Sequence, residues 1–141
     1  MTDQERLKSA IENGEYVVFF GGAGVSTASG IPDFRGANGI FTAGRRFSAE
    51  QIVSSGFFYA HPKEFYDFYK SKMLYPNALP NRAHLKLAEL ESRGKVKAII
   101  TQNIDGLHQK AGSKNVIELH GSALRNYCLR CGKSFDLNYI V

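Results

Sequence analysis

A continuous apolar run that leads directly into a glycine-rich turn constrains the fold of this 141-residue chain more than any other feature. Residues 16–20 (YVVFF) are apolar and partly β-branched, which is typical of a strand buried on both faces in a parallel sheet. Gly21, Gly22, Ala23 and Gly24 follow at once. Backbone without side chains lets a phosphate approach the positive N-terminal end of the next helix. The pattern predicts either a dinucleotide-binding turn or an ordinary tight turn.

The glycine turn matches only part of the dinucleotide-binding fingerprint. Gly22 and Gly24 occupy the first two glycine positions of G-x-G-x-x-G, whereas Thr27 occupies the third. Residues 31–44 are then punctuated by Pro and Gly and have few periodic apolar positions, so we expect a long loop there. Loops of this length inside compact domains are usually functional, which makes this one a candidate cofactor lid.

Strands and helices alternate along the rest of the chain. Thr2 and Glu5 form a capping box that predicts a first helix ending near Asn13 and Gly14, with Gly14 in the left-handed conformation. Further helices are expected over residues 48–54, 61–75 and 81–93, the last between Asn81 as N-cap and Gly94, and further strands over 96–101 and 116–119. This alternation predicts an α/β fold with a parallel sheet, whose ligands bind beyond the carboxyl ends of the strands.

Four separated segments carry polar and charged residues at the ends of these elements. They read GAGVSTASGIPDFRG over 22–36, PNRAH over 80–84, TQNIDGLH over 101–108 and ELHG over 118–121. In sequence, order and spacing these segments resemble the sirtuin family, and the resemblance extends from about residue 5 to the C-terminus.

The resemblance implies an incomplete Rossmann-like parallel sheet. Residues 1–121 are expected to form a partial NAD-binding domain, with a helical insertion at about 46–80. Residues 122–141 are expected to form the first half of a zinc-ribbon module. By the same resemblance the chain is the N-terminal half of such an enzyme, and segments further along the family's sequence complete the NAD and zinc sites.

The resemblance also implies an NAD-dependent protein-lysine deacetylase, which moves an acetyl group from lysine to ADP-ribose and releases nicotinamide. In the family the acyl-lysine carbonyl oxygen attacks C1′ of the ribose, and a histidine accepts a proton from a ribose hydroxyl. His120 matches that histidine, and an imidazole suits a general base near neutral pH. The residues implied in NAD binding are Gly22, Ala23, Gly24, Ser26, Thr27, Asp33, Phe34, Arg35, Gln102, Asn103, Ile104, Asp105 and His120.

Several of these residues have a structural alternative. Asn103 and Asp105 follow a strand and suit an Asx turn, Ser26 suits a helix cap, and Phe34 suits a hydrophobic plug on the core. The other three histidines are each expected to be structural: His61, His84 and His108.

One departure from the family concerns the acyl group. Desuccinylase-like sirtuins carry a Tyr-x-x-Arg pair whose guanidinium holds the acyl carboxylate. Here Tyr66 is followed three residues later by Tyr69, so the arginine is missing. A neutral acyl group such as acetyl is therefore expected, and acetyl-lysine proteins or peptides are the expected substrates.

Cys128 and Cys131 are the only cysteines, and their C-x-x-C spacing is the usual half of a tetrahedral zinc site, which needs four ligands. A thioredoxin-like redox pair is the alternative, although the strand-to-helix context of that motif is not evident. The family supplies its second cysteine pair further along the chain. Self-association is another way to bring a second pair to the site.

Charge and hydropathy exclude some classes of protein. The formal net charge is +5, but the 18 basic residues are scattered among acidic ones, which argues against a nucleic-acid partner. No apolar run is long enough for a membrane span, and the N-terminus does not resemble a signal peptide, so we expect a cytoplasmic protein. The alternative functions are an inactive NAD- or ADP-ribose-binding module, an NAD glycohydrolase or ADP-ribosyltransferase, and a zinc-ribbon adaptor.

Overall fold

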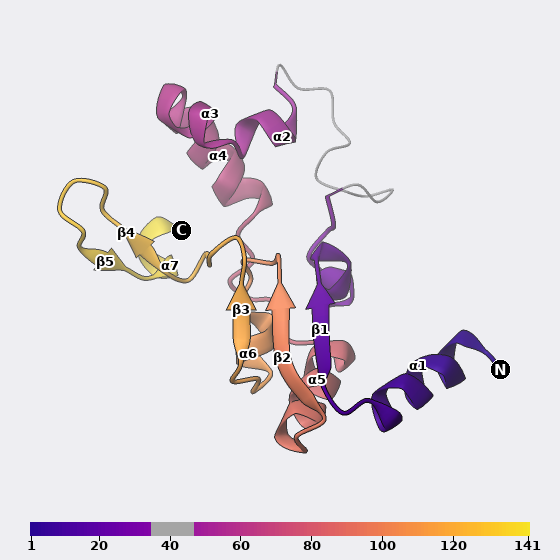
Figure 1. Cartoon of the computed structure of the whole chain (residues 1–141). Coiled ribbons are helices and arrows are strands. Elements are labelled where there is room, and N and C mark those ends of the chain that lie inside the picture. Colours follow the sequence, from indigo (N-terminus) through magenta and orange to yellow (C-terminus); the bar gives the residue numbers. More distant parts are fainter. Residues whose placement is uncertain (35–46) are drawn as a thin grey trace.

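A three-stranded parallel sheet forms the centre of the computed structural model, which describes residues 1–34 and 47–141 (Figure 1). The strands β1 (Val17–Gly21), β2 (Val96–Thr101) and β3 (Val116–Glu118) lie in the order β1-β2-β3. At their last positions Gly21 pairs with Thr101, and Thr101 pairs with Glu118. The carboxyl ends are therefore level, and the segments that follow leave from one edge of the sheet. The predicted α/β fold with a parallel sheet is confirmed.

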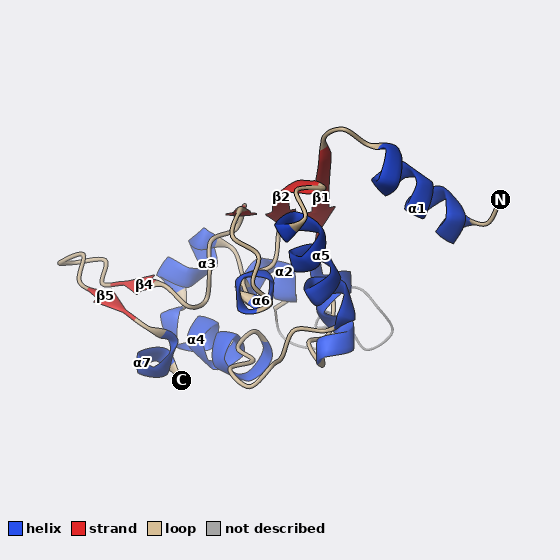
Figure 2. Ribbon diagram, turned by 90° about the horizontal axis from the view of Figure 1, so that it is seen from below, coloured by secondary structure: helices blue, strands red, loops and turns tan. Residues whose placement is uncertain are grey.

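The helices pack mainly on one face of this sheet (Figure 2). There α5 (Arg82–Ser92) contacts both β2 and α6 (Leu107–Lys110), whereas α1 (Asp3–Asn13) lies to the side and has no buried residue. The glycine turn leads from β1 into a 3-10 helix, η1 (Ala23–Ser29). No helix in residues 1–34 and 47–141 is long and apolar enough to cross a membrane.

A separate group of short helices follows residue 47. They are α2 (Ala49–Ile52), α3 (Ser55–Ala60) and α4 (Pro62–Lys72), which contact one another around the buried side chains of Ala49, Ile52, Phe57 and Phe68. Capping explains the boundaries, because the hydroxyls of Ser48 and Ser54 each accept a hydrogen bond from the first turn of the helix that follows. We refer to α2, α3 and α4 as the helical group.

The C-terminal segment forms a small hairpin and a last helical turn. β4 (Asn126–Tyr127) pairs antiparallel with β5 (Ser134–Phe135), and α7 (Leu137–Ile140) follows. Cys128 and Cys131 lie in the connection between the two strands. Figure 1 shows this hairpin at one end of the molecule, beyond the carboxyl edge of the sheet.

Local signals predicted the ends of α5 and β2 well. Asn81 caps α5 through its side chain, Gly94 follows the helix with φ of 72°, and β2 occupies the predicted residues 96–101. The capping box of Thr2 and Glu5 is confirmed as well.

Three expectations were wrong. Gly14 follows α1 with φ of −69°, so the first helix ends without a left-handed residue. β1 is not buried on both faces, since Val18 is 42% and Phe20 is 61% exposed. The reason is the one-sided packing of the helices, which among the described residues leaves the other face of β1 uncovered. Helix 48–54 is also interrupted, because α2 ends at Ile52 and α3 begins at Ser55.

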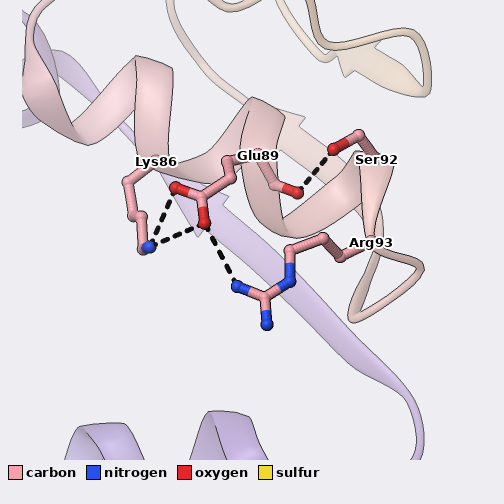
Figure 3. A network of polar contacts seen from close by, with 4 residues as sticks. All are labelled: Lys86, Glu89, Ser92 and Arg93. Carbon is pink, nitrogen blue, oxygen red and sulfur yellow. Dashed lines mark hydrogen bonds and ion pairs between the residues drawn. The ribbon is translucent and has the colours of Figure 1, made fainter.

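The outer face of α5 is polar (Figure 3). The carboxylate of Glu89 accepts hydrogen bonds from Lys86 Nζ at 2.9 Å and from Arg93 Nη1 at 3.2 Å, and Ser92 Oγ donates to the Glu89 carbonyl. Hydrogen bonds from Lys86 and Arg93 hold the pKa of Glu89 below its usual value. Exposed pairs of this kind contribute little to stability, so this face of α5 is an ordinary solvated surface.

Candidate functional site

A cleft of about 860 Å³ opens at the carboxyl edge of the sheet, between the turn after β1 and the helical group. Its walls on the side of the sheet come from the segments that follow the three strands, as expected for a parallel sheet. The residues predicted to bind NAD that line it are Ala23, Ser26, Phe34, Gln102, Asn103, Ile104, Asp105 and His120. The structure thus brings together three of the four sequence motifs, those at 22–36, 101–108 and 118–121.

The remaining predicted NAD-binding residues lie beside the cleft or outside the described residues. Gly22 is the N-cap residue of η1, and a Cβ atom at Gly24 would have no heavy atom within 4 Å. Thr27 Oγ1 donates to the Gly24 carbonyl at 3.0 Å. Asp33 is half-buried and is not among the lining residues. Arg35, with most of the predicted loop, lies outside the described residues.

Ser26 is the most buried polar residue of the cleft, with no exposed surface. Its hydroxyl donates to Asp105 Oδ2 at 2.6 Å and accepts from Asn103 Nδ2 at 3.1 Å. His84 Nε2 lies 3.5 Å from the same oxygen. The alternative of a simple helix cap for Ser26 is wrong, because the hydroxyl joins η1 to the segment after β2.

The hydrogen bonds of His84 determine its protonation state. Its Nδ1 accepts from the backbone N–H of Asn81 at 3.2 Å, so this nitrogen carries no proton. The neutral ring then has its proton on Nε2, which points to Ser26 Oγ. Burial lowers the pKa of His84, and the charge of Asp105 offsets part of this effect. We predicted a structural role for His84, and the structure places it next to the cleft.

Asn81 ties the start of α5 to η1. Its side-chain oxygen accepts from the N–H groups of Ala83 and His84, at 2.9 and 3.5 Å, while its Nδ2 donates to the Val25 carbonyl at 2.8 Å and to Ser29 Oγ at 3.0 Å. The side chain satisfies free helix amides and also fixes the 3-10 helix that follows the glycine turn. The sequence indicated the cap but not the second role, since Val25 lies 56 residues away.

Asp105 makes an Asx turn and also lines the cleft, whereas the side chain of Asn103 donates to Ser26. Asp105 Oδ1 accepts from Leu107 N at 2.9 Å, which is an Asx turn across Gly106, and the same residue lines the cleft. Asn103 N donates to Thr101 Oγ1 at 3.0 Å. Among the residues that the structure describes, the Asn103 side-chain oxygen accepts no hydrogen bond, so it remains open to a donor in the cleft.

His120 lies on the turn after β3 and is exposed to solvent. Its Nδ1 is 3.0 Å from the carbonyl oxygen of Gln102. A carbonyl only accepts, so Nδ1 must carry the proton, and the neutral ring presents the lone pair of Nε2. This is the protonation state that a general base requires.

The two cysteines fit one half of a zinc site. Gly132 N donates to the Cys128 carbonyl at 2.8 Å, which closes a tight turn, and the two thiols are close enough to hydrogen-bond to each other. Hydrogen bonds from the backbone at Cys131 and Arg130 lower the pKa of the Cys128 thiol and so favour the thiolate that binds metals. In residues 1–34 and 47–141 no group of three or more metal-binding side chains comes together.

Parallel strands with level carboxyl ends, a glycine turn after the first strand and a polar cleft at that edge define a Rossmann-like α/β domain. Comparison with known proteins identifies the family. The model of the Sir2 family matches residues 22–141, and the chain belongs to this family, the sirtuins.

Sequence relatives and solved structures support the same family assignment. The chain is 60% identical over 138 residues to an NAD-dependent protein deacetylase of Clostridium perfringens, covering 96% of this chain and 57% of that protein. It is 52% identical to an NAD-dependent protein deacetylase of Saccharolobus solfataricus, covering 94% and 52% respectively. The chain therefore spans about half the length of the curated relatives that it matches.

Two solved Sir2 structures have the same fold over nearly the whole of this chain. A Sir2 variant with deacetylated p53 peptide and 3′-O-acetyl ADP-ribose has a TM-score of 0.88 and 45% identity, over 97% of this chain and 55% of that one. A Sir2 structure with p53 peptide and NAD⁺ has a TM-score of 0.82 and 44% identity, over 98% and 54% respectively.

Proposed function

We propose that this chain carries the nicotinamide-side cofactor site and the catalytic base of an NAD-dependent protein deacetylase. One observation carries the proposal: a single cleft collects the open side-chain oxygen of Asn103, the carboxylate of Asp105 and the imidazole of His120 at the level ends of three strands. The relatives named as NAD-dependent protein deacetylases support it.

The residues of the cleft suit the parts of NAD. Bound NAD supplies an electrophilic ribose carbon from which nicotinamide departs. The turn at Gly22 and Gly24 exposes backbone to the pyrophosphate, and the Asn103 oxygen accepts from a ribose hydroxyl. Phe34, at the cleft wall, excludes water from the reacting carbon.

His120 then acts on the proton of a ribose hydroxyl. The Gln102 carbonyl holds the proton of the ring on Nδ1, so Nε2 accepts the hydroxyl proton as the acetyl group transfers from lysine to ADP-ribose. Asp105, which lines the same cleft, would accept a hydrogen bond from the nicotinamide carboxamide.

Acetyl-lysine is the proposed substrate class. Tyr69 lines the cleft at the position where an arginine would hold an acyl carboxylate, and burial raises the pKa of its phenol. The side chain is therefore neutral at physiological pH and offers a carboxylate no charged partner. A small neutral acyl group is favoured over succinyl.

Zinc is the proposed structural metal. Cys128 and Cys131 would supply two of its four ligands, and the remaining two would come from outside residues 1–141 or from a second copy of the chain. The metal would hold the hairpin of β4 and β5 together and take no part in the reaction. Elemental analysis of the purified protein tests this assignment.

The decisive experiment measures nicotinamide release by the whole protein with and without an acetyl-lysine peptide. Release that depends on the peptide is expected, and His120→Ala should lower kcat by about 10²- to 10⁴-fold, the usual contribution of a general base. Release without peptide would identify a glycohydrolase or ADP-ribosyltransferase instead. Binding without turnover would identify an NAD-binding module, and full activity in the alanine variant would remove His120 as the base.

A further inference from the structure

His108 on α6 is an unusual buried histidine. It is 1% exposed, and among the residues that the structure describes neither ring nitrogen has a hydrogen-bond partner. Leaving a buried donor unpaired costs about 1–3 kcal/mol. Hydrogen bonding therefore does not explain why an imidazole occupies this position.

The contacts of His108 are made by the face and edge of its ring. Its ring centroid lies 4.7 Å from that of His84 with an interplanar angle of 64°, and 5.8 Å from that of Phe19 at 57°. Both are tilted or edge-on arrangements, which aromatic rings favour over a face-to-face stack. The ring of His108 thus stands between β1 and the start of α5.

The His84 ring needs such a neighbour. The ring is bonded to Cβ and can rotate about the Cβ–Cγ bond, and the weaker of its two polar contacts, from Nε2 to Ser26 Oγ at 3.5 Å, restrains that rotation little. Packing against the ring restrains this rotation further. His108 provides this packing, because its flat ring meets His84 nearly edge-on.

The plane of His84 in turn affects the cleft. The contact from His84 Nε2 to Ser26 Oγ is long, at 3.5 Å, so a small tilt of the ring would break it. Ser26 Oγ also binds Asp105 and Asn103, the two cleft residues after β2. A change in the plane of the His84 ring would therefore shift the side chains of both Asp105 and Asn103.

We propose that His108 is a positioning residue of the cofactor site, which acts through its flat ring by setting the plane of His84 and thereby the positions of Ser26, Asn103 and Asp105. The inference rests on the proposed function, because these residues matter only if the cleft holds NAD. His108 itself does not reach the cleft, and it takes no direct part in the reaction.

The test compares His108→Leu, which removes the flat ring, with His108→Phe, which keeps a flat ring and lacks the nitrogens. Both remove the unpaired nitrogens, so the melting temperature should be unchanged or higher in the leucine variant. The leucine variant should bind NAD on the order of 10- to 100-fold more weakly by calorimetry, since displacements near 1 Å have effects of this size. The phenylalanine variant should recover most of the affinity.

A second readout does not depend on NAD. The Nε2–H proton of His84 is enclosed, so we expect a slowly exchanging imidazole NMR signal in the wild type and in His108→Phe, and its loss in His108→Leu. Absence of deacetylation by the wild type would refute the proposed function and leave this comparison intact. Should the leucine variant unfold, His108→Met provides the same comparison, because its flexible side chain adapts to irregular space.

Ser113→Ala is the matched control. Ser113 is also buried, and among the described residues its hydroxyl has no hydrogen-bond partner. Its backbone N–H donates to the His108 carbonyl at 3.1 Å, a bond that the alanine variant keeps. Its alanine variant should keep the wild-type NAD affinity. Wild-type affinity and an intact His84 signal in His108→Leu would overturn the proposal. Equal loss in folded leucine and phenylalanine variants would also overturn it, because the nitrogens rather than the ring would then be required.

Discussion

His120 presents a free Nε2 because a backbone carbonyl defines its tautomer. The acceptor is the carbonyl of Gln102, which directly follows β2, while His120 itself follows β3. The two strands are paired to their last residues. The position of the Gln102 carbonyl next to the His120 ring therefore depends on the backbone of the sheet and not on the identity of a second side chain. The base is therefore oriented by a group that substitution cannot remove.

At the residue scale, Gly24→Ala tests the glycine turn. A Cβ atom here would contact nothing within 4 Å and Gly24 has no positive φ, so stability should be unchanged or rise by about 0.4–1 kcal/mol. The added methyl group should nevertheless obstruct the pyrophosphate and weaken NAD binding on the order of tenfold, about 1.4 kcal/mol.

Calorimetry and thermal unfolding measure the two effects separately. Gly56→Ala is the control, because Gly56 lies in α3 with equally open surroundings and far from the glycine turn in sequence. It should leave NAD affinity unchanged. Wild-type NAD affinity in Gly24→Ala would argue against pyrophosphate binding at this turn.

At the element scale, Asn81→Ala tests how α5 is joined to η1. The change removes a helix cap and two hydrogen bonds to η1, so the free energy of unfolding should fall by about 1–3 kcal/mol. NAD affinity should fall as well, because η1 carries Ser26. Urea unfolding and calorimetry provide the measurements.

Thr2→Ala provides a matched cap on another helix. Thr2 accepts from Glu5 N at 3.2 Å in an equivalent capping box, but α1 has no buried residue. We expect a smaller loss of stability and no change in NAD affinity. Equal effects of the two variants would show that Asn81 acts as a cap alone.

Element boundaries could largely be predicted because their signals are local. Asn81 and Gly94 mark the ends of α5, and the apolar run of β2 stands between them and a polar motif. The role of His84 could not be predicted, because its partner Ser26 lies 58 residues away and only the fold brings the two together. The exposure of Phe20 depends on which layers cover the sheet, and a strand's own residues do not specify that.

At the scale of the whole molecule, two buried neutral histidines make the fold sensitive to acid. Burial lowers the pKa of His84, and burial together with His84 lowers the pKa of His108. Below the unfolded-state value of about 6.5 the unfolded chain binds protons more readily than the folded chain. Their stabilising contribution is therefore complete above pH ~6.5 and is lost as the pH falls toward the lowered folded-state values.

Melting temperatures measured from pH 8 to pH 5 should show this loss. Each unit of pKa difference corresponds to about 1.4 kcal/mol. His108→Phe should reduce the loss because one of the two groups no longer titrates. If the melting temperature of His108→Phe fell with pH as much as that of the wild type, His108 would not be a source of the acid sensitivity.

The saturated hydroxyl of Ser26 has a consequence for how a ligand enters the cleft. Its one donor and two acceptor sites are all engaged within the protein, so the side chains around it are held by hydrogen bonds that need no ligand. A preorganised site loses little conformational entropy on binding and needs no rearrangement during the encounter. We therefore expect association on this side of the cleft to resemble the docking of rigid bodies.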